Sequence, residues 1–179
     1  MDKNFFELVA RRRSCRKFSE QKPERALIEK IMEATLTAPS SKNTRTSRFL
    51  VIDDPQTIAR MAEMRDYGSA FMVGAPVVVL VMGVKAPTDL WEINCAISAT
   101  YLQLAAEEAG LGSCWVHVGG RPRLKDEPQG EQAEEYLRTF LPIPEECGVE
   151  CVIAMGYSPY DEPKPRPEQD NSGKVVWLG

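Results

Sequence analysis

A dense run of basic residues near the N-terminus is the part of this sequence best suited to chemistry. The segment RRRSCRKF, Arg11 to Phe18, holds five positive charges and a hydroxyl. Guanidinium groups offer forked donors that match phosphate oxygens. In an extended segment, Arg12, Ser14 and Arg16 share one face, because side chains alternate. The run therefore predicts a phosphate site, although a solvated cationic helix C-terminus, favoured by the helix dipole, explains the same charges.

The rest of the chain is acidic, so the basic character is local. The 179 residues carry 22 basic and 26 acidic side chains, a net charge of −4, and 17 minus 26 leaves −9 without the run. This balance disfavours a general nucleic-acid or membrane surface. The N-terminus does not resemble a signal peptide, and the apolar stretch Ala75 to Val84 is far shorter than the roughly 20 residues of a membrane helix. We expect one cytoplasmic domain.

Residues that would support other chemistry are sparse. Five irregularly spaced cysteines and a single histidine, His117, predict no metal site. The sequence has no GxGxxG fingerprint, no GxxxxGK[ST] phosphate loop and no GxSxG serine. We therefore predict no dedicated catalytic side chain and assign the chemistry to a bound cofactor.

Hydrophobic periodicity and cap signals predict an α+β chain in which helices and strands are mixed. Helices are expected near residues 5–12, 23–36, 55–62, 90–109 and 131–141, with caps at Asn4, Asp54 and Asp89, and strands near 48–54, 75–84, 114–118 and 150–157. Helix 90–109 is apolar or small nearly all round, as in a core or a subunit interface. Residues 1–157 form the predicted domain. Residues 158–179 form a proline-rich arm whose end, VVWLG, is strand-like and expected to dock on a sister subunit.

Four segments in order resemble the nitroreductase family of FMN-dependent oxidoreductases. The run RRSCRKF is similar to the family's R-R-S-x-R-x-F flavin-phosphate motif, and APSSKN (Ala38 to Asn43) to its P-S-S-x-N loop. EEAGLGSCWV (Glu107 to Val116) is similar to its G-L-G-T-C-W-I segment, and VIAMGYSPYDEPKPRP to its I-A-I-G-Y-P strand with a Lys/Arg-Pro stretch. The resemblance implies a mostly antiparallel central sheet flanked by helices, and a homodimer that exchanges C-terminal arms. It also implies bound FMN, NADH or NADPH as reductant, and a small-molecule electron acceptor.

The resemblance also implies roles for particular residues. The flavin phosphate and pyrimidine side would be held by Arg12, Arg13, Ser14 and Arg16, with Lys164 or Arg166 returning to the phosphate. The main chain of His117 and Val118 would lie beside flavin N5, and the partner subunit would contribute Ser40, Ser41 and Asn43. We interpret Arg65 and Tyr67 as the donors to the pyrimidine edge of the flavin. Arg11 and Lys17 are expected to be solvated. GLGS also fits a helix stop, and PKPRP a plain linker.

Two departures from the family pattern bear on the reaction. NTRTSRF brings Arg45 and Arg48 near the site, for an anionic substrate or nicotinamide phosphates, or as surface charges. His117 stands where glycine is common, as a structural residue or a proton donor. We predict ping-pong transfer from NAD(P)H through flavin N5 to an organic acceptor such as a nitroaromatic or quinone. The alternatives are a flavin-dependent reductive dehalogenase and a non-catalytic module that binds nucleic acid through Arg11 to Lys17, with salt-sensitive affinity.

Overall fold

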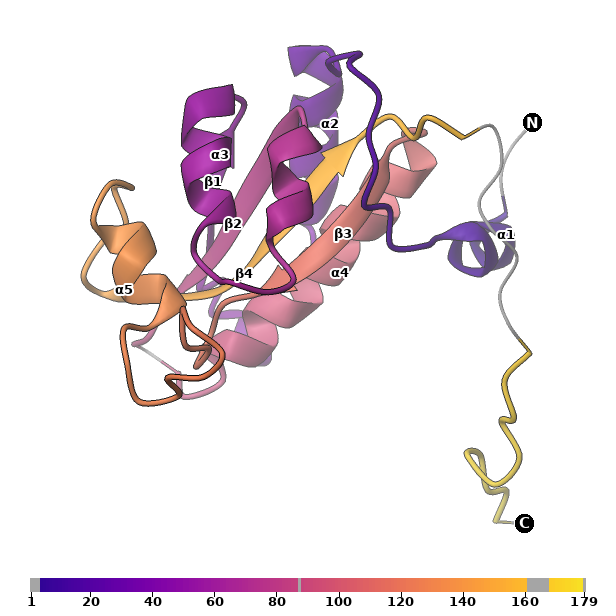
Figure 1. Ribbon diagram of the computed structural model, residues 1–179. Helices are drawn as coiled ribbons and strands as arrows, with labels where there is room; N and C mark the ends of the chain where they lie inside the picture. Colours follow the sequence, from indigo (N-terminus) through magenta and orange to yellow (C-terminus); the bar gives the residue numbers. More distant parts are fainter. Residues whose placement is uncertain (1–3, 87, 161–167, 179) are drawn as a thin grey trace.

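A four-stranded antiparallel sheet organises the chain (Figure 1). The structure, a computed structural model, describes residues 4–86, 88–160 and 168–178. The strands run in the order β1-β2-β4-β3, and each neighbouring pair is antiparallel. Their bounds are β1 Ser47–Ile52, β2 Val77–Val84, β3 Gly112–His117 and β4 Cys147–Gly156. The predicted α+β fold with an antiparallel central sheet is confirmed.

Helices cover both faces of this sheet and make three layers (Figure 1). One face packs against α2 (Arg25–Thr35) and α4 (Trp91–Glu108), and the other against α3 (Pro55–Ala62) and α5 (Ala133–Arg138). The central strands β2 and β4 send alternate residues into the two cores, as a period of two requires. This double burial explains why their sequences are apolar without interruption.

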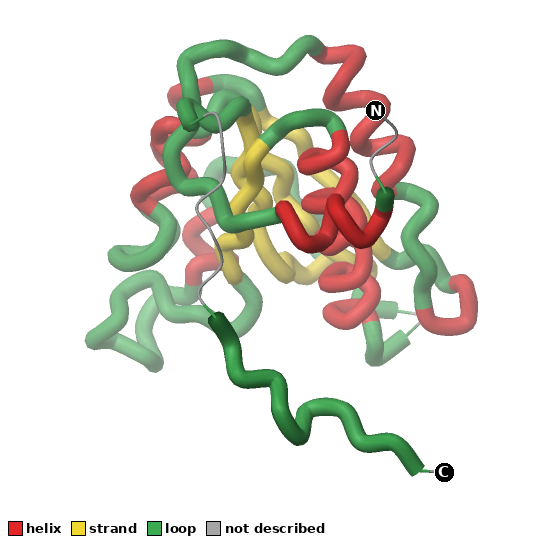
Figure 2. Tube along the Cα trace, turned by 90° about the vertical axis from the view of Figure 1, so that its right-hand side faces the viewer, coloured by secondary structure: helices red, strands yellow, loops and turns green. Residues whose placement is uncertain are grey.

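The shorter helices lie outside these layers or extend them. The 3₁₀ helix η2 (Ala70–Gly74) adds Met72 to the core under α3, and η1 (Ser41–Asn43) precedes β1. Helix α1 (Phe5–Arg11) has no buried residue. It lies beside the C-terminal half of α4, to which its last residue is bonded (Figures 1 and 2).

Local capping explains where several helices begin. Asn4 Oδ1 accepts the Phe6 amide at 3.0 Å, and Asp54 Oδ2 accepts the Thr57 amide at 2.7 Å, so both predicted caps are confirmed. The cap predicted at Asp89 is wrong. Helix α4 has Leu90 at its N-cap, and the Leu90 amide donates to the hydroxyl of Thr88 at 3.1 Å.

Strand β4 contains a bulge in its pairing with β2. Val81 pairs with Cys151 while the next residue, Met82, pairs with Val149, so Glu150 is the additional residue. A bulge turns two consecutive side chains towards one face of a sheet. Here it brings a carboxylate into an otherwise apolar layer.

The C-terminal segment 168–178 extends away from the rest of the molecule (Figure 2). The strand predicted for VVWLG does not form within this segment, where Trp177 is 91% exposed. Docking of this segment on a partner subunit stays a prediction. Within the described ranges, no helix combines the length and the apolar character needed to cross a membrane.

Candidate cofactor site at the edge of the sheet

The segment that follows α1 runs along the edge strand β3. Ser14 forms a parallel bridge with Ser113, and the Cys15 amide donates to the Ser113 carbonyl at 2.9 Å. Gly112 permits this close approach, because a Cβ at that position would lie 2.6 Å from the Cβ of Cys15. The basic segment is therefore extended and fixed to the sheet by a short backbone contact.

The face predicted to hold a phosphate gathers around one buried thiol. Burial raises the pKa of Cys114, and Arg16, the Ser14 hydroxyl and Arg12 each oppose that rise. All three groups therefore lie within electrostatic reach of Cys114, while their shared face and their contact with a phosphate stay predictions. In the described part of the chain, no carboxylate lies within ion-pair distance of Arg16. Its guanidinium sits 5.9 Å from the ring centre of Phe71.

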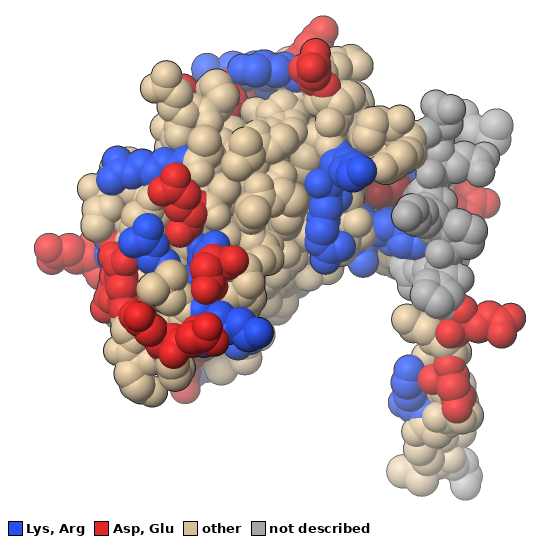
Figure 3. Space-filling view, in the orientation of Figure 1, with Lys and Arg blue, Asp and Glu red and all other residues tan. Residues whose placement is uncertain are grey.

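Two other arginines of the run hold the end of α1. Arg11 Nε lies 2.6 Å from Glu107 Oε1, and Arg11 Nη2 donates to the Glu107 carbonyl at 3.1 Å. The prediction that Arg11 is merely solvated is therefore wrong. Arg13 Nη1 donates to the carbonyls of Ala10 and Arg12 at 2.7 and 2.8 Å, satisfying groups that a helix end leaves open. Basic side chains gather along this part of the surface (Figure 3). Within the run, Arg11 and Arg13 are bonded to the ends of α4 and α1.

The far end of β3 presents backbone groups at the edge of the sheet. The Val118 and Gly119 amides donate inward to the Glu150 carbonyl at 3.0 and 3.1 Å. Because amides alternate in direction along an antiparallel strand, the His117 amide points towards the outer edge. Of the two residues predicted beside flavin N5, His117 therefore has the amide oriented for a ligand, and Val118 uses its own within the sheet.

Arg65 lies beside the same end of the strand. Arg65 Nη1 donates to the His117 carbonyl at 2.8 Å, and its guanidinium stacks 4.0 Å from the ring centre of Tyr67. Arg65 Nε and Ser113 Oγ are buried, and neither has a hydrogen-bond partner among the described residues. Leaving such atoms unsatisfied is costly. Arg65 Nε, beside the outward His117 carbonyl, therefore fits a polar ligand at this end of the edge, while Ser113 Oγ is enclosed on the face covered by α2 and α4.

Glu150 is a residue of the site that the sequence interpretation missed. Its side chain is buried at the β4 bulge, and its Oε1 lies 3.6 Å from Nδ1 of His117. Burial, and secondarily Glu92, raises the pKa of Glu150. Burial, Arg121 and Arg65 lower the pKa of His117. A carboxylate inside the apolar segment ECVIAMGY was the available signal, since a charged residue in a buried strand is uncommon.

The loop Ala38 to Asn43, here called the serine loop, lies at the other edge of the sheet, next to β1. The Ser41 amide donates to Oδ1 of buried Asn94 at 2.8 Å, and Asn94 Nδ2 donates to Thr46 Oγ1 at 3.0 Å. Asn94, within α4, was not singled out from the sequence. Because β1 and β3 are opposite edges, one chain does not bring the serine loop to the basic segment.

The backbone of this loop is held in an uncommon conformation. Lys42, Asn43 and Arg45 have positive φ angles of 49°, 55° and 47°, which cost energy in residues with side chains. The Arg45 amide donates to Ser40 Oγ at 2.9 Å, and Arg48 Nη1 donates to the Arg45 carbonyl at 2.9 Å. Arg48 therefore supports the loop in this chain.

Two expectations concern other parts of the sequence. Lys164 and Arg166, predicted to return to the phosphate, lie outside the described residues. Among the residues that are described, no group of three His, Cys, Asp or Glu side chains is arranged to hold a metal ion.

Comparison with known proteins gives consistent matches. A family model described as the nitroreductase family matches residues 9–67 and 62–157. An Archaeoglobus fulgidus protein provisionally named NADH dehydrogenase/NAD(P)H nitroreductase is 32% identical over 87% of this chain and 85% of its own length. The structure of an FMN-dependent nitroreductase from Clostridium difficile R20291 superimposes with a TM-score of 0.87 and 35% identity, covering 97% of this chain and 98% of that one. A Thermotoga neapolitana iodotyrosine deiodinase is 27% identical over 92% of each chain.

Proposed function

Because the chain belongs to the nitroreductase family, we propose that it is an FMN-dependent oxidoreductase. It passes reducing equivalents from NADH or NADPH to an organic acceptor such as a nitroaromatic or a quinone. The observation that carries this proposal is the outer edge of β3, with clustered guanidinium groups at one end and an outward amide at the other. The similar structure from C. difficile, named as FMN-dependent, supports the choice of cofactor.

The phosphate end of the site is formed by Arg12, Ser14 and Arg16 around Cys114. Cys114 and His117 are separated by about 10 Å along an extended strand, so an elongated ligand can reach both. Arg13, bonded to the end of α1, contributes charge and keeps the segment in place. From the arm, Lys164 or Arg166 completes the phosphate contacts.

The ring end of the site is formed by the His117 amide, the Val118 main chain and Arg65. A donor fixed by the sheet stabilises negative charge that develops near it, without reorganisation during the reaction. When bound, FMN supplies the hydride-transfer chemistry. The chain binds and orients the reactants, and the transfer alternates between donor and acceptor in one pocket.

The complete site needs two copies of the chain. Ser40, Ser41 and Asn43 lie at the opposite edge of the sheet from the basic segment, so the proposed homodimer supplies them from the partner. Exposed apolar side chains on α1 and α4 support such an interface, with Phe6 74% and Ile93 55% exposed. All five cysteines are free thiols, in keeping with the proposed cytoplasmic location.

A second candidate function is reductive dehalogenation on the same cofactor. It is favoured by the similarity to the iodotyrosine deiodinase of T. neapolitana over nearly the full length of both chains. Turnover of a nitroaromatic compared with an iodinated phenol, at matched NADH or NADPH concentrations, separates the two reactions.

The test begins with the colour of the purified protein. We expect yellow protein with flavin absorbance, or a colourless form that regains it on titration with FMN. Anaerobic NADH or NADPH should bleach this absorbance, and a quinone should restore it. Protein that neither contains nor takes up FMN would contradict the proposal. If neither NADH nor NADPH bleached the flavin, only the assignment of the electron donor would be overturned. Light scattering after gel filtration should give the mass of a dimer.

A further inference from the structure

The β4 bulge places a buried carboxylate next to the single histidine of the chain. Without the bulge, alternation would turn the side chains of Glu150 and Cys151 to opposite faces of the sheet. Cys151 belongs to the core under α4, and Glu150 reaches His117, which follows Trp115 on that same face. An irregularity of one residue therefore creates this acid–base pair.

We propose that Glu150 is a positioning residue that holds the His117 imidazole through Nδ1, so that Nε2 can deliver a proton to the reduced acceptor. This inference rests on the proposed oxidoreductase function.

Geometry gives the two side chains different access to solvent. The His117 side chain is 34% exposed and the Glu150 side chain 11%. Within the described residues, no hydrogen bond reaches the Glu150 carboxylate, and its nearest basic group is His117 Nδ1 at 3.6 Å. Because Nδ1 faces this carboxylate, Nε2 lies on the far side of the ring. The buried carboxylate thus orients the ring, and the partly exposed imidazole can exchange protons with water.

Charged groups from each neighbouring element act on this imidazole. Arg65 precedes η2 and Arg121 follows β3, and both disfavour the imidazolium, while Glu92 in the first turn of α4 favours it. Glu150 on β4 is the carboxylate at ion-pair distance. An opposite charge at this separation favours the protonated ring. When ionised, Glu150 therefore acts at Nδ1 against burial and the two arginines, which together lower the pKa of His117.

A proton donor is required by the stoichiometry of the reaction. Reduction of a quinone to a hydroquinone takes up two electrons and two protons. Hydride from NAD(P)H supplies both electrons and one proton. The second proton comes from the His117 imidazolium: its Nε2–H bond breaks, an O–H bond forms on the acceptor, and water reprotonates the neutral ring.

The first experiment measures the pair without any turnover. The chain has one histidine, so tag-free protein gives a single imidazole signal whose titration is followed by NMR. Glu150→Gln should lower the proton affinity of His117 about tenfold, and nitrogen shifts should show loss of the Nδ1–H tautomer. Glu146→Gln, the same change at an exposed position before β4, is the matched control and should have no effect. An unchanged titration in a folded Glu150→Gln protein would overturn the proposal.

The second experiment separates proton delivery from damage to the cofactor site. Ferricyanide accepts one electron and needs no proton, whereas 1,4-benzoquinone needs both. In Glu150→Gln, the fall of kcat/KM for the quinone with rising pH should move to lower pH, and the pH profile of ferricyanide reduction should not move. Equal losses with both acceptors would contradict proton delivery. If wild-type protein reduced neither acceptor, the proposed function would fail, while the NMR titration would still decide the pairing.

Discussion

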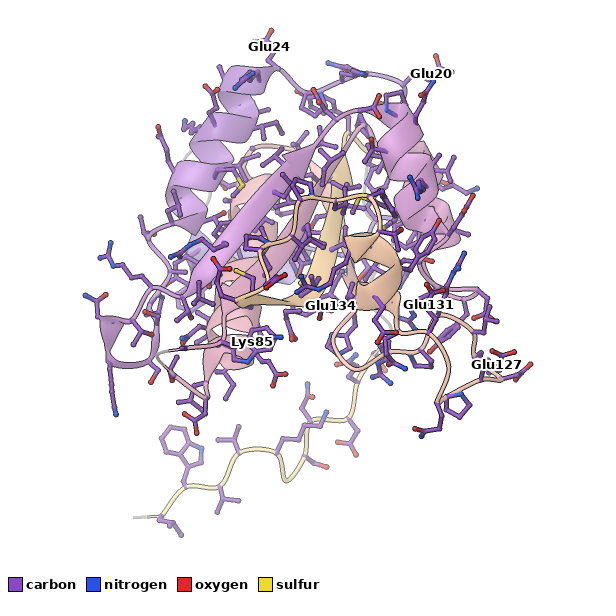
Figure 4. All side chains as sticks on the ribbon, turned by 90° about the vertical axis from the view of Figure 1, so that its left-hand side faces the viewer. Glu20, Glu24, Lys85, Glu127, Glu131 and Glu134 are labelled. Atoms are coloured by element: carbon purple, nitrogen blue, oxygen red, sulfur yellow. The ribbon has the colours of Figure 1, made fainter. Side chains whose placement is uncertain are left out.

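Two regions of this molecule concentrate charge, and they use it differently. Around α5, opposite charges pair with one another: Arg138 lies 2.7 Å from Glu134, and Arg123 lies 2.8 Å from Glu131. Figure 4 shows Glu127, Glu131 and Glu134 on and before this helix. Along the β3 edge, Arg16 instead has no carboxylate at such a distance in the described structure. Paired charges serve the fold, and the cationic group without a carboxylate partner is where we propose that an anionic ligand binds.

The largest effect is expected from a change in the basic segment. Arg16→Ala should weaken FMN binding about tenfold to a hundredfold, because a hydrogen bond to a charged group contributes about 1.5–3 kcal/mol. Lys17→Ala removes the same charge one residue later, where the side chain points to the other face. It should change affinity less than about twofold. Fluorescence titration of apoprotein with FMN measures both. Equal losses of FMN affinity in the two variants would indicate a general basic patch and contradict a specific phosphate site.

A change in the ion pairs around α5 should lower the stability of the fold and leave FMN binding unchanged. Arg138→Ala removes the ion pair to Glu134 and the bonds from Arg138 to the carbonyls of Ile143 and Pro144. The free energy of unfolding should fall by about 1–3 kcal/mol, with FMN affinity unchanged. Urea unfolding measures the loss. Arg25→Ala, which breaks the exposed pair with Glu29, is the control and should leave the urea midpoint unchanged.

The smallest effect concerns Glu150, the buried carboxylate beside the end of β3. Its pKa is raised by burial and then by Glu92, so the folded chain holds this proton to higher pH than the unfolded chain. Stability contributed by this group therefore falls as pH rises from the unfolded pKa through the folded one. Glu150→Gln removes that loss. Its Tm should exceed that of wild type at pH 8, and the difference should close near pH 4. A difference that does not depend on pH would show that ionisation of Glu150 is not the cause.

The sequence predicted the layers of this fold better than the geometry of its site. Apolar runs identified the four strands, most clearly β2 and β4, because burial on both faces leaves a strong pattern. The same double burial hid the bulge at Glu150, since a strand apolar on both sides carries no alternation that could reveal a shifted register. Asn94 was hidden for another reason. Asn94 holds the serine loop through hydrogen bonds with Ser41 and Thr46, which are distant in sequence, and no local pattern predicts such contacts.

The basic run shows the same limit in finer detail. Alternation grouped Arg12, Ser14 and Arg16, because it depends only on an extended backbone, and each of the three acts on Cys114. It could not show that Arg11 pairs with Glu107, because that contact depends on how α1 meets the end of α4. Residue type and spacing identify a chemistry, and the tertiary fold decides which members of a run remain available for it.

The exposed helix α1 has a thermodynamic consequence. A helix of seven residues with no buried side chain is marginal by itself. Its order depends on the contacts at its C-terminal end, next to the residues proposed to hold the phosphate. Binding there and helix formation are then linked equilibria, and each stabilises the other. Amide hydrogen exchange in α1 should therefore slow when FMN is added, so that the N-terminus of the chain reports whether the cofactor is bound.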